Sequence, residues 1–258
     1  MWPGDASCAA CFTFDLDAEE VWIGEDPKNA DRLGVLSQGT YGPKVAVPAI
    51  LDLLARQDVR ATFFVPGRVA ERHPSSVRDV VSAGHELAHH GYTHRGVTTL
   101  EPAEEEDEMR RGLEVLRSFS ADISGYRSPS WELTPQTLSL VAKHGLTYTS
   151  NLMDDIRPYR HEGGIVELPI SWVLDDAPHF WFDGASWTRK IATNEEVWSI
   201  WKAEFDGIRA MGGAFVLTMH PQIIGRPGRL PLLEKTISYV RSHPDVWVTT
   251  AHDVAGVV

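Results

Sequence analysis

Basic residues and long apolar runs are both scarce in this chain. Its 24 Lys and Arg residues stand against 36 Asp and Glu residues, giving a net charge of −12, and the basic residues form no cluster. Because proteins bind nucleic acids by placing Lys and Arg at the phosphates, we expect no nucleic-acid partner. No apolar run is long enough to span a bilayer, and residues 1–5 lack the basic and apolar regions of an export signal. We therefore expect a cytoplasmic protein that does not bind membranes.

Cysteine is equally scarce, with only Cys8 and Cys11 in 258 residues. Their C-x-x-C spacing also occurs in redox and zinc motifs. Both lie in the sequence SCAACFTF, residues 7–14, which is typical of a buried strand, where residues three apart point to opposite faces. We therefore interpret them as small buried side chains rather than as a redox or zinc pair.

The sequence does contain repeated strand and helix patterns along its whole length. Apolar runs predict strands at residues 9–14, 60–65, 86–89, 146–150, 165–168, 214–219 and 246–249, with a further short strand ending near residue 126. Helical patterns cover residues 48–57, 75–83, 102–119, 134–144, 195–211 and 230–241. Most strands lack alternation, as parallel strands buried on both faces should. We expect one α/β domain over residues 1–258, a distorted (β/α) barrel of seven or eight parallel strands, with a doubly wound open sheet as the alternative.

Three segments differ from this repeat in composition. Residues 18–43 are rich in glycine and charge, and residues 171–193 carry the aromatic residues Trp172, Phe180, Trp181, Phe182 and Trp187. We expect both to be long loops, the second packed as a lid or as an oligomer contact. The acidic run at residues 101–108 precedes several arginines in one helical pattern, so we interpret it as a solvated helix face.

Histidines are concentrated in residues 84–94, GHELAHHGYTH, where four of the chain's eleven occur. Two of them, His90 and His94, have the H-x-x-x-H spacing that can place two imidazoles on one divalent ion. Such an ion can convert water into a nucleophile near neutral pH. Two histidines make only half a site, and structural, hydrogen-bonded histidines are the alternative interpretation.

Polar side chains follow five of the predicted strands. Asp15 and Asp17 end the first, His90 and His94 follow the third, Arg127 follows the fourth, residues 154–155 (Asp-Asp) follow the next, and His220 follows a late strand. In a β/α barrel the carboxyl ends of the strands form the active site, so these side chains are predicted to converge.

Asp15 and Asp17 lie two residues apart, so their carboxylates face the same side if the strand continues through them. One carboxylate can complete a two-His, one-Asp metal set that leaves a position open for water, and the other is then left as a base. A turn or helix-capping role is the alternative for an Asp-x-Asp pair at a strand end.

This order of motifs resembles the polysaccharide deacetylase family, also called the NodB-homology or carbohydrate esterase 4 family, over nearly the whole chain. Residues 13–17, TFDLD, resemble the motif T-F-D-D with Leu16 inserted, and the resemblance implies that Asp15 is the catalytic base and Asp17 a metal ligand. Residues 90–94, HGYTH, resemble H-[ST]-x-x-H with Gly91 as the departure, which implies that His90 and His94 bind the metal. The family's fold is a NodB-type barrel related to the TIM barrel.

Two further motifs are also similar to those of the family. Residues 127–129, RSP, match R-x-P-[YW] with the aromatic one place late at Trp131, and residues 218–220, TMH, resemble L-x-H, whose histidine is the family's general acid. The resemblance therefore implies functional roles for Arg127 and His220. For the remaining motif we expect that Asp154 or the neighbouring Asp155 pairs with Arg127 and tunes the base.

The departures resemble a branch that contains cyclic imide hydrolases, allantoinase-like proteins and certain peptidoglycan deacetylases. We expect a metal-dependent hydrolase of carbon–nitrogen bonds other than peptide bonds, with Trp131, Trp172, Asp175 and Asp154 contacting the substrate. The substrate is an acetamido sugar or oligosaccharide, or a small cyclic imide or ureide. Zinc suits the ligand set best, although cobalt, nickel or iron would tolerate it. An inactive sugar- or metal-binding barrel and a metal-dependent esterase are the rival functions, and a homo-oligomer is possible.

Overall fold

The computed structural model describes residues 2–182 and 191–258. Trp187, one of the aromatic residues named above, lies outside the described residues. The strands are β1 (Cys8–Asp15), β2 (Thr62–Val65), β3 (Glu86–His89), β4 (Gly125–Tyr126), β5 (Tyr148–Thr149), β6 (Tyr159–Arg160), β7 (Val166–Glu167), β8 (Ala214–Met219) and β9 (Val246–Val248). The helices are α1 (Glu20–Glu25), α2 (Leu33–Tyr41), α3 (Val47–Arg56), α4 (Gly67–Arg72), α5 (Pro74–Ser82), α6 (Pro102–Leu116), α7 (Thr137–Lys143), α8 (Ala177–Phe180), α9 (Asn194–Met211), α10 (Pro221–Ile224), α11 (Leu230–Arg241) and α12 (Ala251–Ala255).

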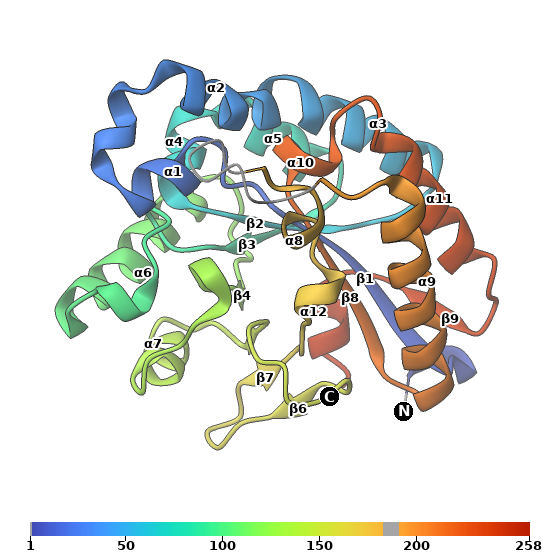
Figure 1. Ribbon diagram of the computed structural model, residues 1–258. Helices are drawn as coiled ribbons and strands as arrows, with labels where there is room; N and C mark the ends of the chain where they lie inside the picture. Colours follow the sequence, from blue (N-terminus) through green and yellow to red (C-terminus); the bar gives the residue numbers. More distant parts are fainter. Residues whose placement is uncertain (1, 183–190) are drawn as a thin grey trace.

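The strands form one curled sheet with helices around it (Figure 1). Its order is β6-β7-β5-β4-β3-β2-β1-β8, and β9 pairs with the amino-terminal part of β1. Neighbouring strands are parallel, except that β6 runs antiparallel to β7. The α/β fold is confirmed. Within the described residues the sheet is a half-barrel, because β8 and β6 at its two ends do not pair with each other.

Strand β1 alternates between two cores. Cys8, Phe12 and Phe14 pack with the helices on one side, in a cluster that includes residues of α3, α9 and α11. Cys11 and its neighbours on the opposite face pack in a second cluster, which contains residues of α12. The two cysteines are buried and free, and burial raises the pKa of the Cys8 thiol to about 11. Their predicted role as buried side chains on opposite faces of a strand is therefore confirmed.

The inner face of β1 continues through Thr13 to Asp15, directly toward the carboxyl ends of the strands. Leu16 points the other way into the helical core and is fully buried. The residue after it, Asp17, is again buried among polar groups. The strand periodicity thus places both carboxylates on one side, as the spacing predicted.

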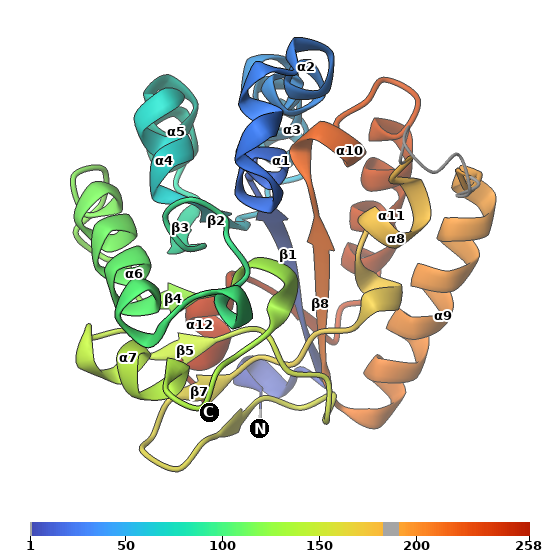
Figure 2. The ribbon, with the colours of Figure 1, turned by 60° about the vertical axis from the view of Figure 1, so that its left-hand side comes forward.

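One expectation about the segments of unusual composition is wrong, and another is confirmed only in part. Residues 18–43 contain α1 and α2, which lie above the carboxyl end of β1 in Figure 2. The acidic run at the start of α6 is not wholly solvated. Glu105 is buried and accepts hydrogen bonds from the Thr134 and Thr137 hydroxyls. Glu108 accepts a hydrogen bond from the backbone N–H of Tyr92, in the loop after β3. Tertiary partners give these two carboxylates roles that composition does not show. Among the described residues, no helix is both long and apolar enough to traverse a lipid bilayer.

Candidate active site

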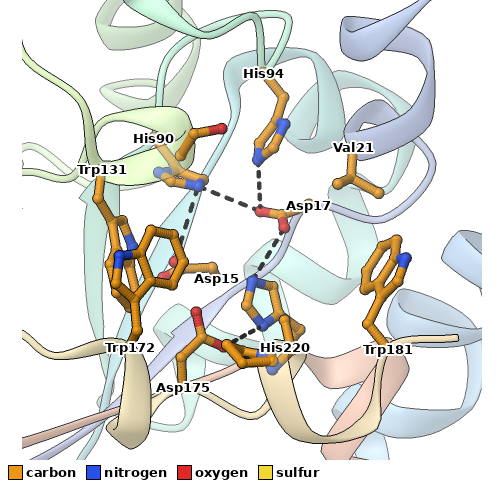
Figure 3. Close-up of a pocket in the computed structure, with 13 residues that line it drawn as sticks. Asp15, Asp17, Val21, His90, His94, Trp131, Trp172, Asp175, Trp181 and His220 are labelled. Atoms are coloured by element: carbon orange, nitrogen blue, oxygen red, sulfur yellow. Dashed lines mark hydrogen bonds and ion pairs between the residues drawn. The ribbon is translucent and has the colours of Figure 1, made fainter. Parts of the chain in front are cut away.

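A pocket of about 510 Å³ opens where β1, β3 and β8 end (Figure 3). Most of its polar residues are those that the sequence placed at separate strand ends, and its apolar walls come from the loops and short helices beyond them. The lining residues are Asp15, Asp17, Val21, His90, His94, Ser130, Trp131, Trp172, Asp175, Ala177, Pro178, Trp181 and His220.

Asp17, His90 and His94 converge on one point of this pocket. Asp17 Oδ1 lies 3.4 Å from His90 Nε2 and 3.5 Å from His94 Nε2. The three residues can offer ligand atoms close enough together to hold one metal ion. One carboxylate and two imidazoles form the donor set of many catalytic zinc sites, with a coordination position left for water or substrate.

The burial and contacts of Asp17 fit a residue that binds a cation. Its side chain is 1% exposed, and Oδ1 has no hydrogen-bond partner. Burial, together with the nearby Asp15 carboxylate, raises the pKa of Asp17 well above its ordinary value despite the opposing effect of His220. Because an unpaired buried oxygen is costly, a divalent ion between Asp17 and the two histidines would satisfy it.

Both histidines are oriented by their surroundings. His90 Nδ1 donates a hydrogen bond of 2.6 Å to the Arg127 carbonyl oxygen, which leaves the lone pair of Nε2 facing Asp17. His94 has a φ of 57°, a left-handed conformation that non-glycine residues rarely adopt. Burial lowers the pKa of His94 well below its usual value, which keeps the imidazole neutral as a ligand must be.

Helix α6 holds the loop that carries His94. The Glu108 carboxylate accepts hydrogen bonds from the backbone N–H groups of Tyr92 and Thr93, at 3.0 and 2.7 Å, and from the Thr93 hydroxyl at 2.7 Å. The start of the same loop is fixed by His89, whose Nδ1 accepts from the Gly91 N–H and whose Nε2 donates to the Met109 carbonyl. His89 therefore supports the site without entering the pocket.

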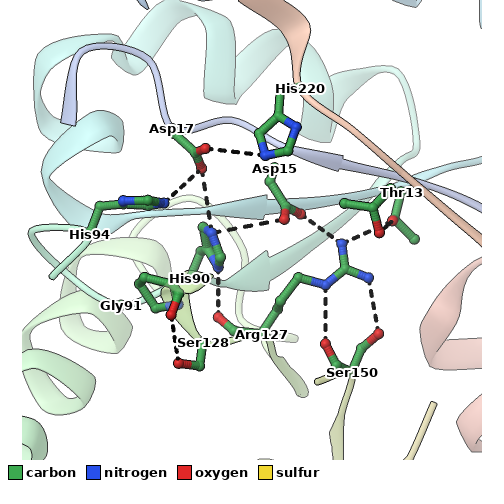
Figure 4. A network of polar contacts seen from close by, with 12 residues as sticks. Thr13, Asp15, Asp17, His90, Gly91, His94, Arg127, Ser128, Ser150 and His220 are labelled. Atoms are coloured by element: carbon green, nitrogen blue, oxygen red, sulfur yellow. Dashed lines mark hydrogen bonds and ion pairs between the residues drawn. The ribbon is translucent and has the colours of Figure 1, made fainter. Parts of the chain in front are cut away.

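Asp15 is held in its ionised form by Arg127 (Figure 4). Arg127 is fully buried, and its Nη1 lies 2.7 Å from Asp15 Oδ1 and 3.0 Å from Thr13 Oγ1. Its other nitrogens donate to the backbone oxygen and the hydroxyl of Ser150. Burial alone would raise the pKa of Asp15, but Arg127, with His90 and His220, lowers it below the ordinary value. The result is an ionised carboxylate beside the metal position.

His220 faces the pocket from the carboxyl end of β8. Its Nδ1 lies 2.7 Å from Asp176 Oδ1, and its Nε2 is 3.6 Å from Asp17 Oδ2. Burial alone would lower the pKa of His220, yet the Asp175 and Asp176 carboxylates raise it well above its usual value. His220 is therefore a protonated imidazolium with Nε2–H available to a reacting group.

Tryptophans form two opposite walls of the pocket, as Figure 3 shows. Trp131 and Trp172 stack with their ring centroids 4.2 Å apart. Ser130 and Trp131 both have a φ of 61°, and this turn brings Trp131 into the wall although it stands one residue later than the family motif has it. Trp181 faces the pocket from the segment after α8 and packs against Trp22 at 5.0 Å.

One predicted site residue lies elsewhere. Asp154 is exposed, does not line the pocket, and accepts a hydrogen bond from the Tyr159 hydroxyl. Asp155 is also exposed and accepts from the backbone N–H groups of the two residues that follow it. The expected pairing of either carboxylate with Arg127 is wrong: β5 ends at Thr149, Ser150 is the residue that contacts Arg127, and both aspartates are exposed.

Three contributing residues had no role in the sequence interpretation. Asp176 orients His220, Trp181 closes one wall, and Glu108 fixes the His94 loop. Asp176 adjoins the predicted Asp175, and Trp181 lies in the aromatic segment, so local signals for both existed. Glu108 stands in a run of acidic residues that otherwise face solvent, and no local pattern distinguishes it.

The sequence profile of the polysaccharide deacetylase family matches residues 40–149. A peptidoglycan deacetylase of Helicobacter pylori is 30% identical over 91% of this chain and 91% of its own length. A crystal structure from Mycobacterium smegmatis, described as a candidate polysaccharide deacetylase, has 42% identity and a TM-score of 0.96 over 100% of this chain and 92% of that one.

A crystal structure of an allantoinase shares the fold, with a TM-score of 0.86 and 24% identity over 99% of this chain and 91% of that one. The long match to the Helicobacter pylori enzyme, with the profile match, establishes the family. The chain belongs to the polysaccharide deacetylase family and is a hydrolase that acts on carbon–nitrogen bonds other than peptide bonds.

Proposed function

We propose that this hydrolase is a divalent-metal-dependent N-deacetylase of a short acetamido sugar. The observation that carries this proposal is the unpaired buried oxygen of Asp17 between two histidine nitrogens, with Asp15 and His220 beside it. The full-length similarity to a peptidoglycan deacetylase supports an acetamido sugar as the substrate class. Zinc is the metal that best suits the Asp17, His90 and His94 donor set.

The bound ion would supply Lewis acidity toward the amide carbonyl and would lower the pKa of water to about 7. Asp15 is the general base: Arg127 keeps its carboxylate ionised, so it can accept a proton from the attacking water. His220 is the general acid, and its Nε2–H donates a proton to the departing amine nitrogen. Asp176 fixes the ring orientation by accepting from Nδ1–H, and Arg127 positions Asp15.

The walls of the pocket contact the remainder of the substrate. The Trp131 and Trp172 pair offers an apolar face against which a sugar ring can stack. Asp175 lines the same pocket, and burial, opposed by His220, raises its pKa to about 7. We propose that Asp175 contacts a substrate hydroxyl or N–H group beside His220.

A second candidate is the ring opening of a small cyclic imide or ureide. It is favoured by the tryptophans on two sides of the pocket, since Trp181 stands opposite Trp131 and Trp172 and limits the room for a polymer. Both reactions break a carbon–nitrogen bond at a carbonyl and need the same base and acid. The two candidate reactions therefore differ only in the substrate that the loops around the pocket admit.

A hydrolysis screen with and without a chelator tests these functions. Zinc-loaded protein is offered N-acetylglucosamine and its short oligomers, succinimide, dihydrouracil and allantoin. Release of acetate from the sugars that stops on chelation supports the proposal, whereas turnover of the cyclic substrates alone replaces it with the second candidate. Hydrolysis of acetate esters alone would identify an esterase, and no turnover by the metal-loaded protein would identify a binding protein.

A further inference from the structure

A second cavity of about 240 Å³ lies next to the catalytic pocket, between α1, α8, α10 and the segment after α10. Trp181 lines both cavities, which therefore adjoin at its side chain. Trp22 and Phe180 make the second cavity largely aromatic, and its polar side includes Gln222, Arg226 and Arg229.

The two arginines have no carboxylate within ion-pair distance anywhere in the described part of the chain. Arg226 stacks over the Tyr41 ring at 3.8 Å and donates from Nε to the Gln222 carbonyl. Arg229 stacks over Phe180 at 4.4 Å and donates from Nη1 to the Ile223 carbonyl. These contacts fix both guanidinium planes, and most of their N–H groups have no acceptor in the part of the chain that the structure describes.

Acidic residues outnumber basic ones in this chain, 36 Asp and Glu against 24 Lys and Arg, yet no described carboxylate forms an ion pair with Arg226 or Arg229. Asp176 acts on Arg229 electrostatically, but its carboxylate is bonded to His220 and forms no ion pair with Arg229. Among the described residues, the two fixed cations lie half-buried beside aromatic rings and form no ion pair, and Asp176 is the only carboxylate that acts on Arg229 at longer range. Such a pair of cations favours the binding of an anion.

Gln222 provides an independent indication of a ligand. Gln222 is 4% exposed and is one of the residues that line the cavity. Within the described residues, neither its amide nitrogen nor its amide oxygen has a hydrogen-bond partner. Buried amides are nearly always paired, because an unpaired one costs about 1–3 kcal/mol. A bound group that both accepts and donates would satisfy the two atoms.

We propose that this second cavity binds a carboxylate carried by the substrate. Arg226 and Arg229 pair with its oxygens, Gln222 bonds the carboxylate and an adjacent hydroxyl or N–H group, and the acetamido group lies beyond Trp181 in the catalytic pocket. This inference rests on the proposed deacetylase function and narrows its substrate to an acidic acetamido sugar. The aromatic lining and the small volume of the second cavity suit a carboxylate group attached to a small organic molecule.

Two ligands of similar shape, of which only one carries a carboxylate charge, test the proposed site. N-acetylmuramic acid and its methyl ester differ by one methyl group, which removes the negative charge of the carboxylate. Arg226→Met and Arg229→Met keep the length and apolar stem of each side chain, and Gln222→Glu places a negative charge at the cavity. The exposed Arg241→Met at the end of α11 is the control variant.

We expect the wild-type protein and Arg241→Met to favour the acid over the ester in kcat/KM by about 10- to 100-fold, chiefly through KM. Each of the three cavity variants should bring that ratio down by about tenfold or more, and 0.5 M salt should do the same in the wild type. A ratio near one in the wild type, or a ratio that the cavity variants leave unchanged, overturns the proposal.

Binding to the metal-free protein tests the cavity separately from catalysis. Trp22 and Trp181 line the cavity, so their fluorescence reports occupancy during titration with the acid or the ester. Tighter binding of the acid that is lost in Arg229→Met supports the carboxylate site even if neither compound is hydrolysed, in which case only the deacetylase function fails. Equal binding of acid and ester overturns the site even if both are hydrolysed.

Discussion

At the scale of single residues, two aspartates of one strand end have opposite electrostatic environments. Asp15 and Asp17 are both 1% exposed, but Asp15 faces the Arg127 guanidinium while Asp17 Oδ1 lies near the His90 and His94 imidazoles. The pKa of Asp15 is therefore lowered and that of Asp17 raised. This difference supports the proposed division of labour, with Asp15 as a base that needs no metal to stay ionised and Asp17 as a ligand that does.

Replacement of the proposed base tests this division. Asp15→Asn should lower kcat by about 10²- to 10⁴-fold, because the amide cannot accept a proton from water. Zinc affinity, measured by competition with a chromophoric chelator, should change far less, since the ligands Asp17, His90 and His94 remain. Loss of zinc binding in Asp15→Asn, with Asp17→Asn as the comparison, would instead show that Asp15 is a ligand.

Protonation of a single residue, His85, also affects the stability of the protein. Its Nδ1 accepts a hydrogen bond from the Ala61 N–H, and burial, with Arg60 nearby, lowers the pKa of His85 from 6.5 to about 4. Because the unfolded chain then binds more protons, this contribution is present in full above pH 6.5 and is lost as the pH falls toward 4.

His85→Asn keeps an acceptor for the Ala61 N–H but does not titrate. We expect its free energy of unfolding, measured by urea denaturation, to fall less steeply than that of the wild type between pH 6.5 and 4. Identical slopes for the two proteins over that range would contradict a depressed pKa at His85. Measurements at pH 7.5 show the cost of the substitution itself.

At the scale of elements, α6 determines the shape of the metal-binding loop. The Glu108 carboxylate accepts a hydrogen bond from the backbone N–H before His94. At the start of the same loop, the Met109 carbonyl accepts a hydrogen bond from His89. A Cβ at Gly112 would lie 2.6 Å from the Gly91 carbonyl oxygen and from His89 Nε2, so glycine is needed for α6 to approach this closely. The left-handed backbone at His94 persists because these contacts hold the residues before it.

Weakening this support should loosen the metal site. Glu108→Gln retains one acceptor oxygen and loses the charge, and we expect zinc affinity to fall by about 10- to 100-fold, as for other residues that orient metal ligands. The measurement is chelator competition on the apoprotein, independent of activity. Glu114→Gln, on an exposed position of the same helix, is the matched control and should bind zinc as the wild type does. Equal affinities in both variants would show that Glu108 does not position His94.

At the scale of the whole molecule, the metal connects distant parts of the chain. Its proposed ligands come from the ends of β1 and β3, and His220 adds the end of β8. An ion that binds only the folded chain stabilises it by about 2.7 kcal/mol at a free concentration one hundred times its Kd. The ion should therefore be a measurable part of global stability.

Removal of the metal tests this coupling. We expect a chelator to lower the Tm of the zinc-loaded protein by several degrees, and re-addition of zinc to restore it. Asp17→Asn should show no zinc-dependent change in Tm. A Tm that does not respond to zinc in the wild type would contradict a metal site at these residues.

Much of the site could be predicted from local features of the sequence. Period-two alternation put Asp15 and Asp17 on one side of a strand, and strand ends at several places predicted convergence with His90, His94 and His220. The pocket does contain these residues. The prediction failed for Asp154 because nothing in its local sequence shows that its side chain is exposed and bonded to Tyr159.

The sequence by itself determined the α/β class, the strand ends that meet and the residues that converge there, because periodicity and burial are properties of neighbouring residues. Only the tertiary structure decided that Asp176 holds His220 and that Glu108 holds the His94 loop. It also decided that Trp181 lines both the catalytic pocket and a second cavity, whose two arginines form no ion pair with any described residue. These contacts join residues 15 or more positions apart, and they depend on the curl of the sheet and on how the loops beyond it pack.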